Sequence, residues 1–448
     1  MRAYLIADKY ALRLAWLACA LAAAVPGRTA AQSCDASPLL VRNANVWTSN
    51  GVLSRRDVLF RDGRVASIEP SAERAAQGVR TIDASGQTLL PGLVDTHLHF
   101  SIPGGLPAES PNRADAARLT GRQLIRSGLT SGRLHLASLE EASALKMRSA
   151  DPCRALPRLQ VGGPAISGAA TRDASNFWAV TGVEDAVAKV ERLRSAGVDW
   201  MAIHDADKFA PDVLQTLAAA ARRAGIRLMA AGSTPAEIDA ALTVDPDTLD
   251  YIDRSEAPTY TAALGDRIRA RRDLTVAPTI GVFFRGDRYV KEPSELEDPA
   301  NFEFLGQSER AHVLQAAKTG IAGADGERAQ RYLATTSVKM RQLLALGVPL
   351  ALASDSGSPF HFQAGAVWWE LEAWRAMGAT HRQALTAATI GAARVLHAND
   401  IGRLEVGSRA DFVLYRGDVE NGAFDARRVV AVGKGGVLFV ADGRWIAN

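Results

Sequence analysis

Eight short apolar segments recur through the middle of the chain, and amphipathic helical patterns separate them. A strand followed by a helix and then by another strand is the repeating unit of a parallel sheet. Eight such units predict an α/β fold of the (β/α)8 TIM-like barrel class, in which functional side chains gather at the carboxyl ends of the strands. The segments are LVDTHLHF from Leu93, LTSGRLHL from Leu129, RLQVGGPAI from Arg158, VDWMAIHD from Val198, IRLMAAGS from Ile226, LDYIDRSE from Leu249, LTVAPTIGV from Leu274 and VPLALASDS from Val348.

Start signals precede two of the intervening helices. Thr234 is followed directly by Pro235 and, three residues after the threonine, by Glu237, which is the pattern of a helix N-terminus with a capping box. Thr181 and Glu184 have the same spacing. We therefore expect Thr181 and Thr234 each to cap the helix that follows.

Both ends of the chain carry short β-rich runs broken by turn signals. Residues 39–70 contain Asn-Gly and Asp-Gly pairs between apolar residues, a pattern typical of hairpins. The C-terminal sequences ADFVLYRGD and VVAVGKGGVLFVADGRW repeat that style. We predict a small composite β-sandwich domain from residues 32–90 and 402–448, and a barrel from residues 91–401. The charged segment 291–331 is expected to be an insertion over the barrel mouth.

The first residues have the arrangement of an export signal. Arg2, Lys9 and Arg13 precede the apolar run LAWLACALAAAV, and small Thr-Ala-Ala residues follow at 29–31. The apolar run has 12 residues, too few to span a bilayer core of roughly 30 Å. We therefore predict a cleaved signal peptide in residues 1–31, a periplasmic or secreted location, and no stable membrane anchor.

The charge balance of the mature chain limits the class of partner that it can bind. Removal of residues 1–31 would take away four of 52 basic residues and one of 49 acidic residues, leaving equal numbers of each. Nucleic-acid binding requires clustered lysine and arginine, so we expect a small-molecule partner and no nucleic acid. A homo-oligomer is compatible with the sequence.

Export permits a disulfide between Cys34 and Cys153, and two separate buried thiols are the alternative.

The segment LLPGLVDTHLHF, residues 89–100, ends an apolar run with His97 and His99. Side chains two residues apart in a strand lie on the same face, so both imidazoles are expected at the end of the first barrel strand. Imidazole nitrogen is a preferred ligand of zinc and related cations. The pair therefore predicts half of a metal site, and packing over the barrel core is the alternative.

Three motifs, in this order, resemble those of the amidohydrolase superfamily, in particular its imidazolonepropionase and prolidase-like branch. LLPGLVDTHLHF resembles the first-strand metal motif, ALASDSGSPF the last-strand aspartate motif, and ALTAATIGAARVLHANDIGRLEVGSRADFVLY the closing signature. The resemblance runs from about Leu39 to the C-terminus. It implies a metal-dependent hydrolase in which His97, His99 and Asp355 bind a divalent cation and Asp355 also takes the proton from the attacking water. A carboxylate that caps its own turn is the alternative for Asp355.

The chain departs from the superfamily at other ligand positions. Ala202 stands where the resemblance places a bridging lysine, and Ala231 and Arg254 stand at or beside the places of two histidines. These departures predict a reduced centre with one divalent cation, zinc, instead of two. His204 follows Ala202 by two residues on the same strand face and is a further candidate ligand. A hydrogen-bonded histidine that lines the pocket is the alternative.

Three side chains are candidates for substrate binding. Arg254 carries a permanent charge near the predicted barrel mouth and suits a substrate carboxylate, unless an ion pair with a neighbouring acid occupies it. His361 follows the aspartate motif, and Arg133 lies at the end of the second strand. A loop residue with no role is the alternative for His361.

These observations leave two functions open. The first is an exported hydrolase that splits a carbon–nitrogen bond of a small amide or cyclic amide at a single metal ion. The second is a catalytically degenerate protein that keeps the barrel to bind a small molecule. The substituted ligand positions motivate the second function, because a fold alone does not define an activity. The breadth of the resemblance and the further candidate ligand His204 favour the first.

Overall fold

The computed structural model describes residues 34, 36–71, 78–169 and 176–447, so the predicted signal peptide lies outside the described residues. Among the described helices, none combines the length and the apolar character that crossing a membrane requires. Cys34 and Cys153 are both disulfide-bonded, so the alternative of two free thiols does not hold. The described residues from 36 onward belong to one compact unit, and its elements are described below.

Eight parallel segments follow one another around a ring, as the alternation of strands and helices predicts. β6, β7 and β8 pair in that order, and β9, β11, β12, β13 and β14 pair in that order. β8 and β9 are the two halves of the third barrel strand, since the first half pairs with β7 and the second with β11. The strands are β6 (Leu93–Leu98), β7 (Leu129–Leu134), β8 (Arg158–Val161), β9 (Ala165–Ser167), β11 (Trp200–His204), β12 (Arg227–Ala231), β13 (Thr248–Asp250) and β14 (Thr275–Ala277).

The eighth segment, residues 349–356, closes the ring through backbone hydrogen bonds on both of its edges. On one edge, the backbone N of Ala351 donates to the carbonyl of Val276 in β14 at 3.0 Å. On the other edge, the backbone N of Asp355 donates to the carbonyl of His97 in β6 at 2.8 Å. The carboxylate motif therefore lies directly beside the histidine motif.

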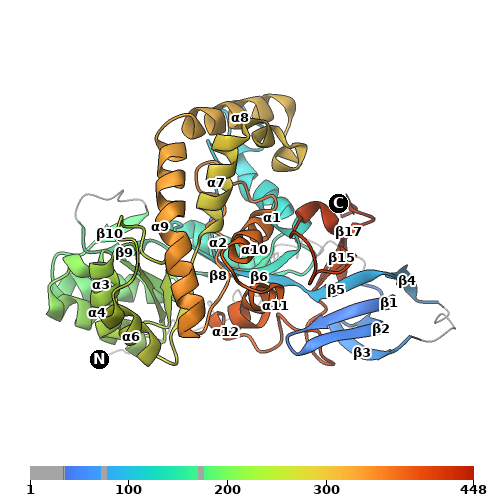
Figure 1. Ribbon diagram of the computed structural model, residues 1–448, viewed down its shortest axis with the longest axis horizontal. Helices are drawn as coiled ribbons and strands as arrows, with labels where there is room; N and C mark the ends of the chain where they lie inside the picture. The colour runs from blue at the N-terminus through green and yellow to red at the C-terminus, as the bar shows by residue number, and fades with distance from the viewer. Residues whose placement is uncertain (1–33, 35, 72–77, 170–175, 448) are drawn as a thin grey trace, which may run out of the picture. The chain divides into compact units, whose positions relative to one another are not determined.

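Helices connect the barrel strands, and most of them bury one apolar face. The longer connecting helices carry buried alanine, leucine, valine or isoleucine on that face. Figure 1 shows α3 and α4 side by side along one part of the ring. The helices are α1 (Ala116–Arg126), α2 (Leu139–Ala150), α3 (Val183–Ser195), α4 (Pro211–Arg223), α5 (Pro235–Ala241), α6 (Ala262–Ala270), α10 (Ala366–Ala376), α11 (His381–Thr386) and α12 (Ala392–Val395).

The two predicted helix starts have different outcomes. Thr234 caps α5, because its side chain accepts a hydrogen bond from the backbone N of Glu237, and that prediction is confirmed. The prediction for Thr181 is wrong, since α3 begins after Gly182 without a side-chain cap. Thr181 instead donates from its backbone N and its hydroxyl to the carboxylate of Asp185. Asp185, an acidic residue in the first turn of α3, is therefore the hydrogen-bond partner of Thr181.

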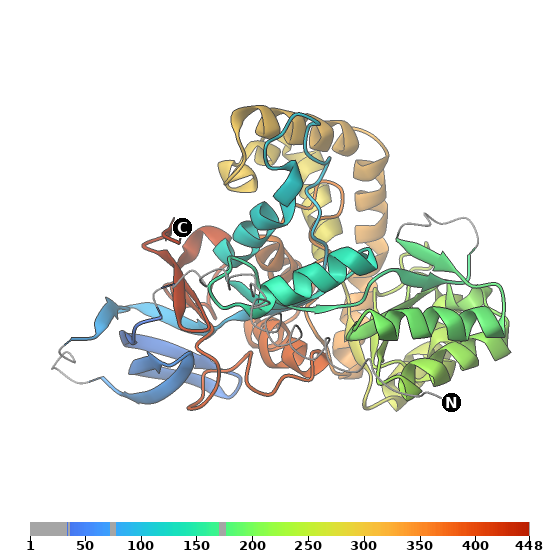
Figure 2. The same ribbon diagram turned by 180° about the vertical axis from the view of Figure 1, so that it is seen from behind.

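Three further helices form a layer with an apolar core of its own. They are α7 (Gly281–Lys291), α8 (Gln307–Ile321) and α9 (Ala324–Leu346), and both views show them standing together (Figures 1 and 2). Phe283 of α7, Val313 of α8 and Ala329 of α9 belong to one buried cluster. Side chains of α7 and α9 line the same cavity as Asp355. The segment predicted as an insertion therefore belongs to a layer beside the carboxyl ends of the barrel strands.

A nine-stranded sheet is built from both ends of the chain, as predicted. β5 and β15 join the two ends through antiparallel pairing, with Leu89 opposite Leu414. The order along the sheet is β18-β17-β16-β15-β5-β1-β2-β3, and β4 also pairs with β1. The strands are β1 (Leu39–Thr48), β2 (Gly51–Arg61), β3 (Arg64–Pro70), β4 (Arg80–Asp83), β5 (Gln87–Pro91), β15 (Phe412–Arg416), β16 (Val429–Lys434), β17 (Val437–Ala441) and β18 (Arg444–Trp445).

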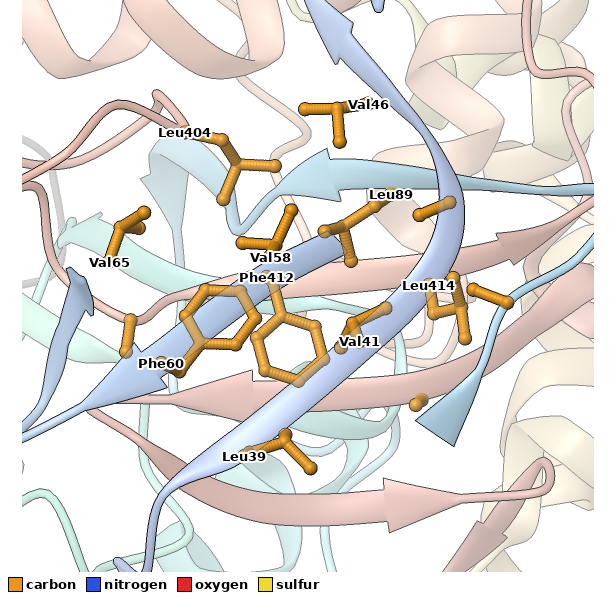
Figure 3. Close-up of a cluster of buried hydrophobic side chains, with 14 of the residues drawn as sticks. Leu39, Val41, Val46, Val58, Phe60, Val65, Leu89, Leu404, Phe412 and Leu414 are labelled. Carbon is orange, nitrogen blue, oxygen red and sulfur yellow. The ribbon is translucent and has the colours of Figure 1, made fainter. Parts of the chain in front are cut away.

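This sheet curls around a single apolar core. β2 and β15 are three places apart in the strand order, a separation of roughly 14 Å across a flat sheet. Yet the rings of Phe60 in β2 and Phe412 in β15 stack at 4.6 Å with an interplanar angle of 16°, and Figure 3 shows the two rings facing each other. The inner faces of the two halves therefore pack on each other, as in a sandwich.

Phe412→Ala tests this core. Phe412 has no exposed surface, so its truncation removes buried apolar area and leaves a cavity that costs about 3–5 kcal/mol. Chemical denaturation should show that loss in the free energy of unfolding. Leu53→Ala is the control, because Leu53 lies in β2 with 40% of its surface exposed and should change the value by about 0.5 kcal/mol or less. Equal effects of the two substitutions would contradict a core between the two halves.

Candidate metal centre

Three of the four predicted ligands meet where the first and last barrel segments pair. His97 lies in β6, His99 follows the end of that strand, and Asp355 lies in the closing segment. His99 Nε2 is 2.9 Å from Asp355 Oδ1, and His97 Nε2 is 3.8 Å from the same oxygen. One ligand atom from each residue lies within 4.8 Å of the others. The structure therefore brings these three side chains together as one possible metal-binding group.

Hydrogen bonds at the Nδ1 atoms determine which ring nitrogens can bind a metal. His97 Nδ1 lies 2.8 Å from Asp250 Oδ2, and His99 Nδ1 lies 3.0 Å from the backbone carbonyl of His135. Carboxylates and carbonyls accept hydrogen bonds, so Nδ1–H donates and Nε2 carries the lone pair in each neutral ring. His99 Nε2 and Asp355 Oδ1 are then two acceptors facing each other, which requires a proton or a cation between them. Two imidazole nitrogens and a carboxylate oxygen are a donor set that fits a divalent cation such as zinc.

Asp250 holds His97 from inside the barrel, although it was not among the residues identified from the sequence. Arg133 Nη2 donates to both of its carboxylate oxygens at 2.8 and 2.7 Å. Burial opposes the charge of Asp250, but Arg133 and His97 outweigh burial and hold the pKa of Asp250 below its ordinary value. Arg133 also donates to Thr248 and to the carbonyl of Thr96, and only 4% of its side chain is exposed. Arg133 was predicted to contact substrate, and these contacts instead make it a positioning residue for Asp250.

Asp355 remains ionised because hydrogen bonds and a neighbouring guanidinium offset its burial. Burial alone would raise the pKa of Asp355, but the hydrogen bond with His99 and the charge of Arg254 contribute to holding it well below its ordinary value. Arg254 Nη2 lies 3.3 Å from Oδ2, and the hydroxyl of Ser358 donates to Oδ1 at 2.8 Å. An ionised carboxylate in this environment can bind a cation and can accept a proton.

His204 lies at the end of β11 and contacts the metal-binding group indirectly. Its Nε2 is 3.2 Å from the Nε2 of His135, whose ring stacks on Trp200 with an interplanar angle of 13°. The ring centroids of His135 and His97 are 4.1 Å apart. Burial lowers the pKa values of His135 and His97, which favours neutral rings. The strand ends therefore gather four histidines, and His204 reaches His97 and His99 through His135 rather than joining their group of three ligands.

The other residues singled out in the sequence occupy different environments. Arg254 lines a cavity beside Asp355. His361 is fully buried, is not among the residues that line this cavity, and has a pKa lowered by burial to about 3. The structure thus makes His361 an enclosed neutral ring instead of the substrate contact that was predicted. Ala202 and Ala231 are buried in β11 and β12, and neither side chain offers a ligand atom.

A cavity of about 550 Å³ lies over Asp355. One part of its wall is apolar, with Val282 and Phe283 of α7 and Phe360. Arg254 and Asp355 contribute opposite charges to another part. A small molecule in this space would meet an apolar surface and, within the same cavity, the carboxylate of the candidate metal centre.

Comparisons with known proteins agree with this fold. The profile of the amidohydrolase family matches residues 88–438. An imidazolonepropionase of Salinispora arenicola is 26% identical over 393 residues, which are 84% of this chain and 92% of that protein. A dihydroorotase of Halalkalibacterium halodurans is 29% identical over 174 residues, 37% of this chain and 40% of that protein. The crystal structure of a Xaa-Pro dipeptidase with bound methionine has a TM-score of 0.70 at 19% identity and covers 90% of this chain and 100% of that one.

The family match spans most of the chain, from the end of the first β-rich region to the C-terminal strands. The chain therefore belongs to the amidohydrolase family, which consists of metal-dependent hydrolases. The predicted resemblance to the amidohydrolase superfamily is confirmed, and the proteins similar to this chain include an imidazolonepropionase.

Asp250→Asn tests how His97 is held. The substitution removes the negative charge that fixes the His97 tautomer and pairs Arg133, so we expect metal affinity to fall by about 10- to 100-fold. Competition with a chromogenic chelator measures that affinity. Asp266→Asn is the matched control, because Asp266 is 64% exposed and pairs with Arg269 on the surface of α6. Unchanged metal affinity in a folded Asp250→Asn protein would exclude a positioning role for Asp250.

Proposed function

We propose that this protein is an exported hydrolase that splits a carbon–nitrogen bond of a small amide or cyclic amide at a single divalent cation, zinc. The proposal rests on the group of His97, His99 and Asp355, whose ligand atoms lie within 4.8 Å of one another. Membership of the amidohydrolase family supports the hydrolysis of a carbon–nitrogen bond. The cavity beside Asp355 has a volume typical of small-molecule sites, which range from about 300 to 1,000 Å³.

Asp355 is suited to move the proton in this reaction. A divalent cation held by the three residues would lower the pKa of a water molecule to about 7 and polarise the substrate carbonyl. The pKa of Asp355 is held low, so the carboxylate is ionised at neutral pH and available to accept the proton of the attacking water. Because the protonated form of such a group is a strong acid, it passes the proton on to the leaving nitrogen.

Three substitutions support one cation in place of two. Ala202 and Ala231 provide no ligand atoms at the ends of β11 and β12. Arg254 provides a permanent positive charge 3.3 Å from Asp355 Oδ2. A second cation on that oxygen would be repelled by the guanidinium, which cannot be deprotonated in a protein.

Export to the periplasm or the extracellular space is the second part of the proposal. Residues 1–31 have the charge and apolar pattern of a cleaved signal. Disulfides persist in oxidising compartments, and Cys34 and Cys153 are disulfide-bonded. A signal and a disulfide both support function outside the cytosol.

His97→Ala tests the proposed reaction centre. After reconstitution with zinc, mass spectrometry should find one metal equivalent per wild-type chain and a small fraction of that in the variant. Hydrolysis of any amide or cyclic amide that the wild-type protein turns over should fall on the order of 100-fold or more. His312→Ala is the control, because His312 lies exposed on α8 and should leave both measurements unchanged.

Two outcomes would contradict the proposal. Wild-type protein that retains no metal after reconstitution would exclude the metal-dependent reaction. Metal retention with no turnover across a broad panel of amides, together with tight binding of one of them, would favour the catalytically degenerate binding protein.

A further inference from the structure

The two carboxylate oxygens of Asp355 face two different groups, the candidate metal ligands on one side and a guanidinium on the other. Its Oδ1 faces the ring nitrogens of His97 and His99, at 3.8 and 2.9 Å. Its Oδ2 faces the guanidinium of Arg254, with Nη2 at 3.3 Å. The metal-binding side and the guanidinium side of one carboxylate therefore point in different directions.

Aromatic rings hold the guanidinium of Arg254 by its faces. Its Cζ lies 3.5 Å from the ring centroid of Tyr251 and 5.1 Å from that of Phe283. Stacking of this kind restrains the plane of a guanidinium and leaves its N–H edge free to make hydrogen bonds. The Nε of Arg254 is buried and has no hydrogen-bond partner among the described residues. Arg254 is thus fixed in position while part of its hydrogen-bonding capacity is unused.

A strained turn fixes the backbone of Arg254. Tyr251 has a φ value of 73°, in the left-handed region that bulky residues rarely adopt, and Asp253 has a φ value of 66° in the same region. The buried ammonium of Lys339 in α9 holds this turn, with Nζ 3.0 Å from Asp253 Oδ2, 2.9 Å from the carbonyl of Asp253 and 3.2 Å from that of Ser255. The position of Arg254 is therefore determined by the fold and not by its contact with Asp355 alone.

Arg254 and Asp355 face the same cavity. Both residues line it, and 23% of the Arg254 side chain is exposed. A ligand atom that approaches Asp355 in this space comes within reach of the guanidinium edge. A structural ion pair without a further role would not require a guanidinium that is stacked between aromatic rings and faces the cavity.

We propose that Arg254 is a catalytic residue whose guanidinium takes the place of a second metal ion and binds the oxygen of the scissile carbonyl. The proposal rests on the proposed hydrolysis. As the water oxygen bonds to the carbonyl carbon, the π electrons of the carbonyl move to its oxygen, and the Arg254 N–H groups stabilise the resulting negative charge. The proton of the water passes to Asp355 and then to the nitrogen, the carbonyl re-forms, and the carbon–nitrogen bond breaks. One water is consumed, and an acid and an amine are released.

Arg254→Met and Arg254→Lys test this role with inorganic phosphate as the probe, since its oxygens resemble the charged oxygen of the tetrahedral state. Isothermal titration of the metal-loaded protein should show phosphate affinity reduced about 30-fold or more in Arg254→Met, and less in Arg254→Lys, which keeps the charge but loses the planar fork. Metal content should remain at the wild-type value in both. With any substrate that is turned over, kcat of Arg254→Met should fall about 100-fold, with a smaller change in KM.

Arg331→Met is the matched control, because Arg331 lies exposed on α9 and is not among the cavity-lining residues. It should change phosphate affinity less than twofold. Wild-type phosphate affinity in Arg254→Met, or a loss of its metal, would overturn the proposal, because Arg254 would then act only by supporting Asp355.

The same titration on metal-free protein separates this proposal from the proposed function. If the wild-type chain fails to bind metal, the proposed function fails. Phosphate binding that still depends on Arg254 would then support the anion-binding role, and phosphate binding that is independent of Arg254 would overturn it.

Discussion

The pairing of the first and last barrel segments is the constraint on which the candidate site depends. His99 and Asp355 are 256 residues apart in the sequence, and only ring closure brings them together. Asp355 N donates to His97 O at 2.8 Å, and His99 N donates to Ser356 O at 2.8 Å. These two bonds lie on either side of the carboxylate, so they fix its register against the histidines. A shift by one residue would turn each side chain to the opposite face of its strand, and the three ligand atoms would no longer meet.

Buried charges are the second feature of the barrel interior. Arg133 and Asp250 form an ion pair with 4% and 0% of their side chains exposed, although burying two charges costs several kcal/mol per ion before their attraction offsets it. The cost is tolerable because each charged group has several hydrogen bonds, including the one that Asp250 accepts from His97. A buried ion pair is weak evidence for stability. Its stronger physical consequence here is the fixed tautomer and orientation of His97.

The parts of the structure that the sequence predicts are those encoded by local patterns. The eight strand segments follow from apolar runs bounded by turns, and His97 and His99 follow from their spacing of two in a strand. Asp355 was found through its motif, since nothing in the local pattern says which strand lies beside β6. The cap at Thr234 depends on four consecutive residues and is confirmed. At Thr181 an equally good local pattern fails, because Asp185 offers the threonine another partner.

The residues that sequence reasoning missed or misplaced act through tertiary contacts. Asp250 is one acid among many at a strand end, and its importance comes from facing His97 and Arg133 across the barrel. The same limit explains Arg133, because a strand pattern does not show whether a guanidinium reaches the mouth or the interior. His135 carried only a weak signal, its place at the end of the second strand. Its contact with His204 depends on the curvature of the ring.

Backbone strain links the fold to the chemistry of this site. Tyr251, Asp253 and Asp355 all have positive φ values, and a residue in such a conformation costs roughly 1–3 kcal/mol that the surrounding structure must supply. Buried Lys339 supplies part of it at Asp253, and the strand pairing of the closing segment supplies it at Asp355. Rigid placement matters most for groups that stabilise a charge developing during a reaction, because they then need no reorganisation at that moment. A cavity that only enclosed a ligand would gain little from holding one guanidinium and one carboxylate in place through strained backbone at Asp355 and beside Arg254. This arrangement favours catalysis over simple ligand binding at these strand ends.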